Sequence, residues 1–575
     1  MILQNDDRTL GTPGEMDCAR EAIHLSGAIQ PHGYLLSCTL PDWVVRHASA
    51  NIAGLLDMPP DQVIGKRLGE HVADDVLQPL LEAIALLEPG ATPQRAAVGN
   101  IGALAHLCDI SVHVASGLVH LEIEPRTVNA VRQAPTVVAQ RMISRVSGAA
   151  DMRGFHQRSA EEIRQLTGYD RVMVYRFRHD DAGEVIAEAR ADDMEPFLGL
   201  RFPASDIPAQ ARALYVRNRI RVIPDSRYQA VPILPGRDVA GAPLDLSQHA
   251  LRSVSPVHLE YLRNMGVAAS MSVSIVSGGR LWGLIACHHR EPRLVPPSVR
   301  AAADMFSLFV SMRVSAAEQA IAMQHESRAR EVRDRLALRL SGREDLSTSL
   351  IGALDLLESA VPCDGIALRS DGQWHTHGRT PTLDGLPHAL EWARGQGADR
   401  LPATDHAASW LLPDANEGLA GVLAIRFGRR DDWLLFFRRE QVEDVVWAGD
   451  PHKPMVATDD GVRIAPRKSF ASWRETVRGR SLPWSDADRT AAERLRWLLQ
   501  ERPWQPLPDD AENVSDMRLF RRRHVLSEQK SRLDQLGALL DGLGHLEDAE
   551  TARIGERIAA LEAELRQLML GNSLS

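Results

Sequence analysis

The chain of 575 residues is longer than one hydrophobic core supports, because single cores stop growing at about 250–300 residues, so several domains are expected. A composition of 44% hydrophobic and 25% charged residues is typical of globular protein and excludes a fibrous or wholly disordered chain. With a net charge of −10 and no long run of Lys or Arg, a nucleic-acid or anionic-membrane surface is not predicted.

The sequence has no stretch of about 20 apolar residues that would predict a membrane span, and its first residues lack the basic and apolar regions of a signal peptide. We therefore expect a cytoplasmic protein without a membrane partner. The cysteines lie far apart and form no CxxC pair, so neither a disulfide framework nor a metal site is predicted. They are Cys18, Cys38, Cys108, Cys287 and Cys363.

Residues 29–125 alternate short apolar runs with turn signals, which predicts a small α+β domain with an antiparallel sheet. Helical segments follow, and a strand at 171–178 begins a second α+β domain. Its later strands, at 268–276 and 281–288, are separated by a hairpin-like Gly278-Gly279 turn. The helical segments are expected at 136–147 and 159–167.

Residues 297–340 contain almost no Gly or Pro, and their apolar residues recur at helical spacing. They predict one helix, roughly 60 Å long at about 1.5 Å per residue, that connects domains. Residues 345–505 predict a third α+β domain with a long irregular insertion at 447–483 and a closing helix at 486–499.

The last stretch, residues 514–575, is leucine-rich and follows heptad spacing. This pattern predicts a helical segment that forms a parallel dimeric coiled coil. Gly542 and Gly544 leave a helical hairpin open as the alternative.

The most unusual segment is LRFPASDIPAQAR at 200–212. Pro203 and Pro208 stiffen a turn, and Ser205 or Asp206 can cap the helix that follows. By composition alone, this is an ordinary turn before a surface helix. As a whole string, however, it resembles the bilin-binding motif of bacterial phytochromes. The likeness extends over residues 15 to about 513, with further motifs in family order: DCAREAIH (17–24), GAIQPHG (27–33), RSVSPVHLEY (252–261), LWGLIACH (281–288), WAGDP (447–451), PRKSF (466–470) and WRE (473–475).

The resemblance implies the α+β photosensory core of a red/far-red photoreceptor, with PAS, GAF and PHY domains whose antiparallel sheets are flanked by helices and joined by a long helical spine. It also implies a figure-of-eight knot, in which the segment around Ile29 passes through the insertion at 231–246. The implied bounds are 1–28 for an N-terminal extension, 29–130 for PAS, 136–310 for the bilin-binding GAF domain, 311–513 for PHY with a tongue at about 447–483, and 514–575 for the C-terminal coil.

The chromophore implied by the resemblance is biliverdin, a linear tetrapyrrole with two propionates. Such a ligand needs an apolar slot and cationic or hydroxyl anchors. Arg221 and Arg252 are the implied propionate anchors, since guanidinium binds carboxylates bidentately. Without the motifs, both would be read as solvated surface charges. The implied hydroxyl helpers are Tyr215, Ser255, Ser270 and Ser272.

By resemblance, His258 and the backbone carbonyl of Asp206 lie at the pyrrole nitrogens, and His288 hydrogen-bonds the D-ring carbonyl. A lone buried histidine is otherwise more often structural. The resemblance also implies an apolar and aromatic wall around the D ring. Without the resemblance, these residues would be read as ordinary hydrophobic core. The wall residues are Met173, Tyr175, Phe202, Ile207 and Tyr261.

Cys18 aligns with the attachment cysteine of bacterial phytochromes, so its thiolate is expected to form a thioether with the A-ring vinyl group. Apart from its flanking motif, a thiol near the chain start would be incidental. Cys287 is a poor candidate, because it neighbours His288 on a strand and faces the other way.

The resemblance further implies light-driven isomerisation between rings C and D, followed by a switch of the tongue. Arg467 would pair with Asp206 in the red-absorbing state and Ser469 would replace it in the far-red-absorbing state. The spine and the coil would then carry the signal to an unknown output partner, in a homodimer. Other tongue residues expected to signal are Trp447, Trp473 and Glu475.

No phosphoacceptor helix or ATP-binding glycine boxes follow Asn513, so no enzymatic activity is expected. Two alternatives to this photoreceptor interpretation stay open. One is that the chain is a photosensory fragment of a light-regulated histidine kinase. The other is that it is a non-photochemical GAF-type sensor of heme or another ligand.

Overall fold

The computed structural model divides the chain into two compact units, residues 1–500 and 501–575. Within the first unit it describes residues 21–500, except 88–91, 103–106, 127–132, 239, 341–345, 398–400, 411–417, 428–430, 452–454, 459–460, 465–469 and 471. Cys18, Arg467, Ser469 and the expected coil at 514–575 therefore lie outside the described residues. In the described part of the chain, no helix combines the length and the hydropathy needed to cross a membrane.

The first domain contains the expected antiparallel sheet, which has seven strands in the order β1-β11-β3-β2-β6-β5-β4. Its apolar side chains pack against short helices. The strands are β1 (Ala28–Ile29), β2 (Tyr34–Thr39), β3 (Val45–Ser49), β4 (Gln94–Gly99), β5 (Cys108–Ala115), β6 (Leu118–Pro125) and β11 (Val231–Leu234), and the helices are η1 (Ile23–Leu25), η2 (Ala50–Ile52), α2 (Ala53–Leu56), α3 (Pro60–Val63), η3 (Leu68–Glu70) and α4 (Asp74–Ala85).

The segment 23–30 is bonded on both sides by parts of the second domain. On one side, β1 pairs with β11, which also pairs with β3. On the other side, the backbone N–H groups of Leu246 and Ser253 donate to the carbonyls of His24 and Ala28, each at 2.9 Å. A segment threaded through the insertion would make such contacts on both sides. The knot itself stays a prediction.

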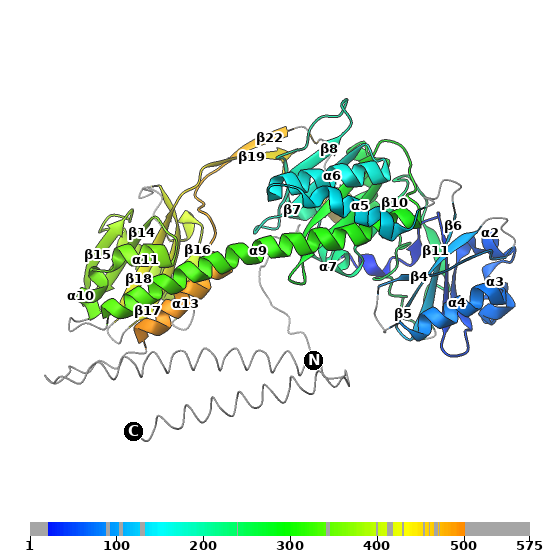
Figure 1. Ribbon diagram of the computed structural model, residues 1–575, viewed down its shortest axis with the longest axis horizontal. Helices are drawn as coiled ribbons and strands as arrows, with labels where there is room; N and C mark the ends of the chain where they lie inside the picture. Colours follow the sequence, from blue (N-terminus) through cyan, green and yellow to red (C-terminus); the bar gives the residue numbers. More distant parts are fainter. Residues whose placement is uncertain are drawn as a thin grey trace, which may run out of the picture. The chain divides into compact units, whose positions relative to one another are not determined.

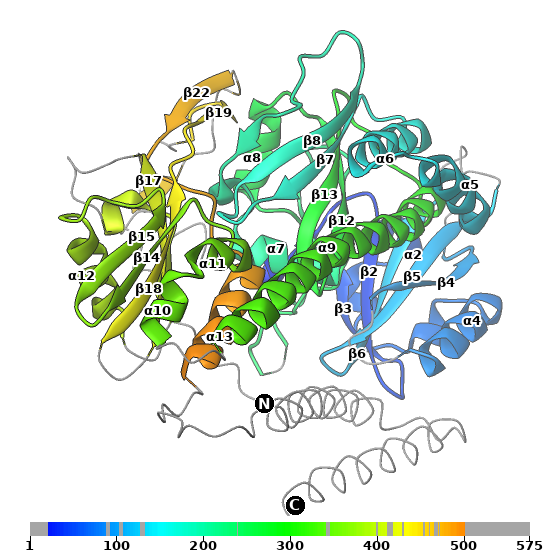
Figure 2. The ribbon, with the colours of Figure 1, turned by 60° about the vertical axis from the view of Figure 1, so that its left-hand side comes forward.

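The second domain is built on an eight-stranded sheet in the order β10-β12-β13-β7-β8-β9-β19-β22. Helices α5, α6 and α9 pack on one face of it (Figure 2). The expected strands and helices are present, and their bounds lie within a few residues of the expected ones, except that α6 begins seven residues earlier. The elements are α5 (Pro135–Ser147), α6 (Met152–Thr167), β7 (Arg171–Phe177), β8 (Gly183–Arg190), β9 (Arg201–Phe202), η4 (Ala204–Asp206), α7 (Ala209–Arg217), β10 (Ile220–Ile223), α8 (Pro256–Asn264), β12 (Ala269–Ser277) and β13 (Arg280–His289).

The predicted connecting helix is confirmed as α9, Pro297–Leu340, with 44 residues (Figure 1). It packs against β12 and α5 of the second domain and against α11 and α13 of the third. Because one continuous helix contacts both domains, it is a direct mechanical link between them.

The third domain has a five-stranded sheet in the order β15-β14-β18-β17-β16, with an apolar cluster on each face. The expected closing helix is α13. The elements are α10 (Leu346–Ile351), α11 (Leu354–Ala360), β14 (Gly365–Ser370), β15 (Gln373–Gly378), α12 (Leu386–Gly395), β16 (Ala403–Thr404), η5 (Ala407–Ser409), β17 (Leu419–Phe427), β18 (Asp432–Arg439) and α13 (Asp486–Gln500).

The expectation of an irregular insertion at 447–483 is wrong where this segment forms strands, whereas 449–451 and 478–483 are irregular. The strands are β19 (Glu443–Ala448), β20 (Met455–Thr458), β21 (Gly461–Ile464) and β22 (Ser472–Val477). The pairing of β19 with β22 and of β20 with β21 satisfies their backbone polar groups. We call this segment, residues 443–477, the hairpin arm.

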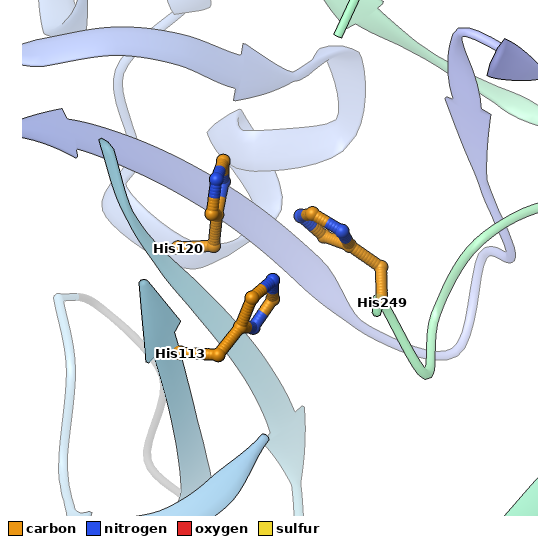
Figure 3. Close-up of side chains that lie close together, drawn as sticks. All are labelled: His113, His120 and His249. Atoms are coloured by element: carbon orange, nitrogen blue, oxygen red, sulfur yellow. The ribbon is translucent and has the colours of Figure 1, made fainter. Parts of the chain in front are cut away.

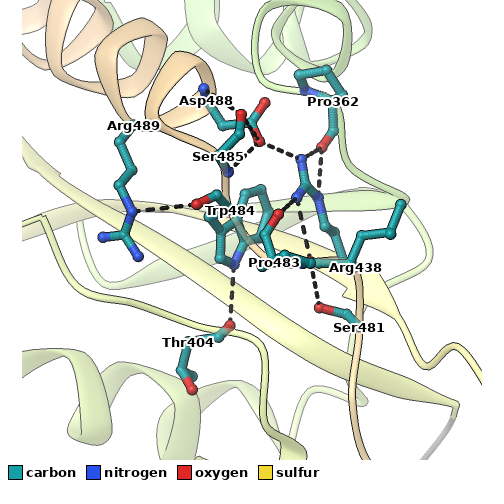
Figure 4. Close-up of polar contacts among 10 residues, drawn as sticks. Pro362, Thr404, Arg438, Ser481, Pro483, Trp484, Ser485, Asp488 and Arg489 are labelled. Atoms are coloured by element: carbon teal, nitrogen blue, oxygen red, sulfur yellow. Dashed lines mark hydrogen bonds and ion pairs between the residues drawn. The ribbon is translucent and has the colours of Figure 1, made fainter. Parts of the chain in front are cut away.

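The hairpin arm returns to the third domain at a buried polar anchor (Figure 4). The Arg438 guanidinium forms an ion pair with Asp488 at 3.0 Å and donates to the carbonyl of Pro483 at 2.7 Å. It also lies over the Trp484 ring, 3.9 Å from the centroid. The return of the arm is therefore fixed to the third domain by Arg438.

Candidate functional site

Strand register brings polar side chains to one face of the eight-stranded sheet. Ser272 of β12 lies opposite Arg221 of β10, and Ser270 lies opposite His288 of β13. These side chains share one face, because residues two apart on a strand point the same way. The same face also carries Met173, Tyr175, Leu284 and Ala286.

The other face of these strands is apolar and packs under α5, α6 and α9. Cys287 belongs to this face, as expected, and burial raises the pKa of its thiol. A buried protonated thiol is a poor nucleophile. The Cys287 side chain therefore points away from the cavity, and its thiol is not reactive enough to attach a ligand there.

Short elements from the connections cover the polar face. They are η4, α7 and α8, which follow or precede prolines that fix the backbone φ angle. The expectation that Ser205 or Asp206 caps α7 is wrong: Pro208 is the N-cap residue, and no side chain makes a capping hydrogen bond. Instead, Asp206 accepts a hydrogen bond from the Tyr261 hydroxyl at 3.0 Å.

Two neighbouring cavities lie between this cover and the sheet, with about 1050 and 700 Å³ of empty space, including space open to solvent. Volumes of this order suit ligands larger than a few atoms. Every predicted cofactor-binding residue except Cys18 lines one or both cavities. Those that line both are Asp206, Ile207, Tyr215, Arg221, His258 and Tyr261; Arg252 and Ser255 line the first; Met173, Tyr175, Phe202, Ser270, Ser272 and His288 line the second.

Two buried cations stand beside each other at the first cavity. Arg221 donates to the carbonyls of Ala250 (3.0 Å) and Arg252, and Arg252 donates to the carbonyl of Ile23 at 3.0 Å. Among the described residues, neither guanidinium forms an ion pair. Burial lowers the pKa of both, that of Arg252 to about 9 with a further contribution from Arg221. Burying unpaired charges is costly, so an anionic ligand here would relieve that cost.

At the second cavity, His288 is a buried neutral histidine. Burial, with smaller contributions from Arg171 and His258, lowers its pKa to about 3. Its Nδ1 has no hydrogen-bond partner among the described residues. His258, the other predicted histidine, stacks on the Tyr261 ring with centroids 5.9 Å apart. Both histidines line the cavity, and Nδ1 of His288 is available to bond a ligand there.

An aromatic wall surrounds this end of the site. Tyr175 lies 5.8 Å from Phe202 between ring centroids, and sequence reasoning missed two further members, Phe177 and Phe197. It also missed Gly183, where an added Cβ would lie 1.6 Å from Cζ of Tyr175. The wall therefore depends on the absence of a side chain at 183, a requirement that no local sequence pattern reveals.

The hairpin arm contacts the rim of the site. β19 lies parallel to β9, with Trp447 opposite Arg201, and Glu443 forms ion pairs with Arg201 and, at 3.9 Å, with Arg178. The Phe470 ring meets the Tyr261 ring edge-on, with centroids 5.1 Å apart. The arm thus touches the same tyrosine that bonds Asp206.

The other predicted residues of the arm stabilise the arm itself. Trp447 lies opposite Trp473 across the hairpin, and its Nε1 donates to Glu475 Oε2 at 2.7 Å. Trp473 is 45% exposed, so it is not part of the cavity wall.

The described part of the chain begins at the first cavity. Glu21, three positions after Cys18, lines this cavity together with Ile23. Its Oε2 accepts a hydrogen bond from the Ser255 hydroxyl at 2.8 Å. Three residues span at most about 11 Å. The Cys18 backbone is therefore within that distance of a residue lining the cavity.

Three protein-family models match most of the described residues. The phytochrome region matches residues 329–503, the GAF domain residues 151–314 and the PAS fold residues 18–126.

Curated relatives agree with these matches. A bacteriophytochrome of Pseudomonas aeruginosa is 38% identical over 570 residues, which is 96% of this chain and 75% of the relative. A bacteriophytochrome of Xanthomonas campestris is 35% identical, covering 86% of this chain and 79% of the relative. Cyanobacterial phytochrome B of Nostoc is also 35% identical, and this chain spans 65% of its length.

Among solved structures, a bacteriophytochrome of R. palustris superimposes with a TM-score of 0.71 at 36% identity, covering 84% of this chain and 98% of that one. The phytochrome photosensory core module of Stigmatella aurantiaca gives a TM-score of 0.71 at 37% identity, with 84% and 97% covered.

Proposed function

The chain belongs to the bacteriophytochrome family and is a red/far-red photoreceptor with a linear tetrapyrrole chromophore; from this premise we propose that its two neighbouring cavities hold biliverdin, attached through Cys18. The observation that supports this most strongly is the pair of buried arginines, Arg221 and Arg252, without an ion-pair partner among the described residues. Biliverdin brings two propionates, which supply the missing negative charges.

The remaining residues fit the rest of such a ligand. The hydroxyls of Tyr215, Ser255, Ser270 and Ser272 supplement the arginines along the cavity edge. His258 and the carbonyl of Asp206 would face the pyrrole nitrogens, while neutral His288 would hydrogen-bond a terminal carbonyl. The aromatic wall keeps the surroundings of that ring packed, so that one methine bridge turns while the rest of the ligand stays fixed.

The bound tetrapyrrole supplies photoisomerisation between rings C and D. This chain's residues turn that change into a signal: the turn at Asp206 is bonded to Tyr261, and Tyr261 contacts the hairpin arm through Phe470. We infer that the arm is the tongue and that Arg467 and Ser469 alternate as partners of Asp206. The arm's anchor at Arg438 and helix α9 then carry the signal onward.

The response to the light signal is produced by a domain or protein other than these photosensory domains. No kinase domain is found in the chain, and we propose that it acts as a homodimeric sensor, without enzymatic activity of its own, on a partner yet to be identified. This chain spans 75%, 65% and 79% of the three curated relatives described above. A second form of the proposal is therefore that the chain is the photosensory part of a larger signalling protein. A cytoplasmic location stays a prediction from the sequence.

Attachment through Cys18 is tested by co-expression with heme oxygenase, followed by zinc-induced fluorescence of the denatured chain. We expect fluorescence in the unaltered chain and in the control Cys363→Ser, whose thiol lies in the third domain. We expect none in Cys18→Ser. A fluorescent Cys18→Ser band would overturn the attachment and leave the cavity proposal standing.

A further inference from the structure

Three histidines that are distant in sequence meet where the first and second domains join (Figure 3). His113 lies on β5, His120 on the neighbouring strand β6, and His249 in the connection after β11. Their ring centroids are 4.4 to 4.8 Å apart, and all three residues are fully buried. Sequence reasoning predicted no metal site from the spacing of the cysteines and did not single out these histidines, of which residue 249 lies far from the other two along the chain.

Most of the ring nitrogens in this cluster lack hydrogen bonds. His120 is held by the Ser37 hydroxyl at 2.8 Å and the carbonyl of Ala115 at 3.2 Å. The ring nitrogens of His113 and His249 have no partner in the described part of the chain. Buried polar atoms are nearly always satisfied, so an unsatisfied group points to a missing partner such as an ion.

Burial also favours the neutral form of these three imidazoles, because a charged ring would be removed from water. Neutral imidazoles keep the lone pair that a metal ion accepts, and protons do not compete for it near neutral pH.

We propose that His113, His120 and His249 form a zinc site that fastens the first domain to the insertion of the second. One nitrogen of each ring can be chosen so that all lie within 4.8 Å of one another. A tetrahedral zinc ion with Zn–N distances of about 2.0–2.1 Å holds its ligands roughly 3.3 Å apart, so binding draws the rings together. His113 and His120 must turn out of their stacked arrangement, and His120 must give up its hydrogen bond to either Ser37 or Ala115 to free a ring nitrogen. Water fills the fourth position.

Such an ion would act beside the contacts between segment 23–30 and the insertion of the second domain. Two ligands belong to the β5–β6 hairpin, while His249 follows Leu246, whose N–H donates to the carbonyl of His24. An ion that binds only the folded state stabilises it in proportion to the logarithm of its concentration over Kd. Zinc would therefore raise the thermal midpoint of the chain without contacting the cavities.

The test is zinc titration of the full bilin-loaded chain, stripped with a chelator, by isothermal calorimetry and thermal unfolding. We expect one equivalent bound and an upward shift of the midpoint. His249→Gln should weaken binding at least about tenfold and abolish the shift. His156→Gln, which alters a buried histidine stacked on Trp282 instead, should preserve both.

Because bilins also bind zinc, the titration is repeated on the bilin-free full chain. In both preparations, the unaltered chain should bind one equivalent of zinc, and the variant that lacks a ligand histidine should bind zinc more weakly. Circular dichroism checks the fold of His249→Gln, and His113→Gln replaces it if it does not fold. No binding at about 100 µM zinc, or equal binding with and without either ligand histidine, would overturn the site.

Discussion

Tyr261 of α8 donates its hydroxyl to Asp206 of the η4 turn at 3.0 Å, so one hydrogen bond joins two of the elements that cover the cavities. The ring of the same tyrosine contacts Phe470 of the hairpin arm. Tyr261 thus connects the turn that would face the chromophore to the element that would transmit its signal.

Tyr261→Phe removes only the hydroxyl, and the aromatic wall remains. Loss of a hydrogen bond to a carboxylate in a partly buried site should lower the free energy of unfolding by about 1 kcal/mol. Dark reversion should become about fivefold faster, because Asp206 loses one of its restraints. Urea unfolding and absorbance after red light measure the two effects.

Tyr228→Phe is the matched control. The Tyr228 hydroxyl accepts from the N–H of Val254 at 2.8 Å and does not contact Asp206. It should lose similar stability but keep the reversion rate of the unaltered chain. Equal reversion rates in both variants would remove Tyr261 from the signalling route.

Arg221→Gln tests the anchoring of an anionic ligand. It removes one of two buried guanidinium groups at the cavity, and charge-assisted hydrogen bonds contribute about 1.5–3 kcal/mol, so bilin affinity should fall at least tenfold. The control is Arg219→Gln, since Arg219 lies outside both cavities and pairs with Asp304 at 2.8 Å. If both variants take up bilin equally well, as measured by absorbance titration of the bilin-free chain, the anchor role is wrong.

Glu443→Gln should loosen the hairpin arm from the second domain. Glu443 is half exposed and pairs with Arg201 and Arg178, so the loss should be near 1 kcal/mol, or about fivefold faster amide exchange across 443–448. Asp444→Asn is the control, because Asp444 bonds Thr476 within the hairpin at 2.9 Å. Unchanged exchange in Glu443→Gln would mean that backbone pairing alone holds the arm.

Stability should fall as the pH drops below about 6.5, the usual histidine pKa in an unfolded chain. Burial lowers the pKa of His32 and His156 to about 4 and that of His288 to about 3, so the unfolded state binds more protons between these values and 6.5. Each contributes stability that is complete above pH 6.5 and declines by about 1 kcal/mol per pH unit below it.

Denaturant unfolding of the metal-free chain at pH 7.5, 6.5 and 5.5 measures this slope. His156→Asn should reduce this slope by the contribution of about one proton taken up on unfolding. A stability that stays level down to pH 5.5 would show that these histidines can be protonated without unfolding.

Hydrophobic periodicity was enough to predict α9 and the main strands of the second domain. The alternation along 268–276 and 281–288 sets which side chains share a face, and register then brings Ser270 and His288 together. Local pairing accounts for that one contact, whereas the other cavity residues were predicted only because their motifs resemble those of bacterial phytochromes.

Features that depend on distant pairing were not predictable. The strand character of 443–448 comes from pairing with β22 and with β9, where Trp447 meets Arg201. The Tyr175 ring occupies the space that Gly183 leaves because it has no side chain. The histidine cluster needs the domain junction to bring His249 to β5 and β6. In each case, tertiary contact decides the role of a residue whose sequence neighbours give no signal.

Whether the cavities hold biliverdin is tested most directly by difference spectra of the full chain, co-expressed with heme oxygenase, under alternating red and far-red light. We predict a reversible red/far-red difference that disappears, with the bound pigment, in the Arg221→Gln/Arg252→Gln double variant and persists in Arg219→Gln. A chain that gives no such difference, or a double variant that keeps the pigment and the full difference, would contradict the proposed site.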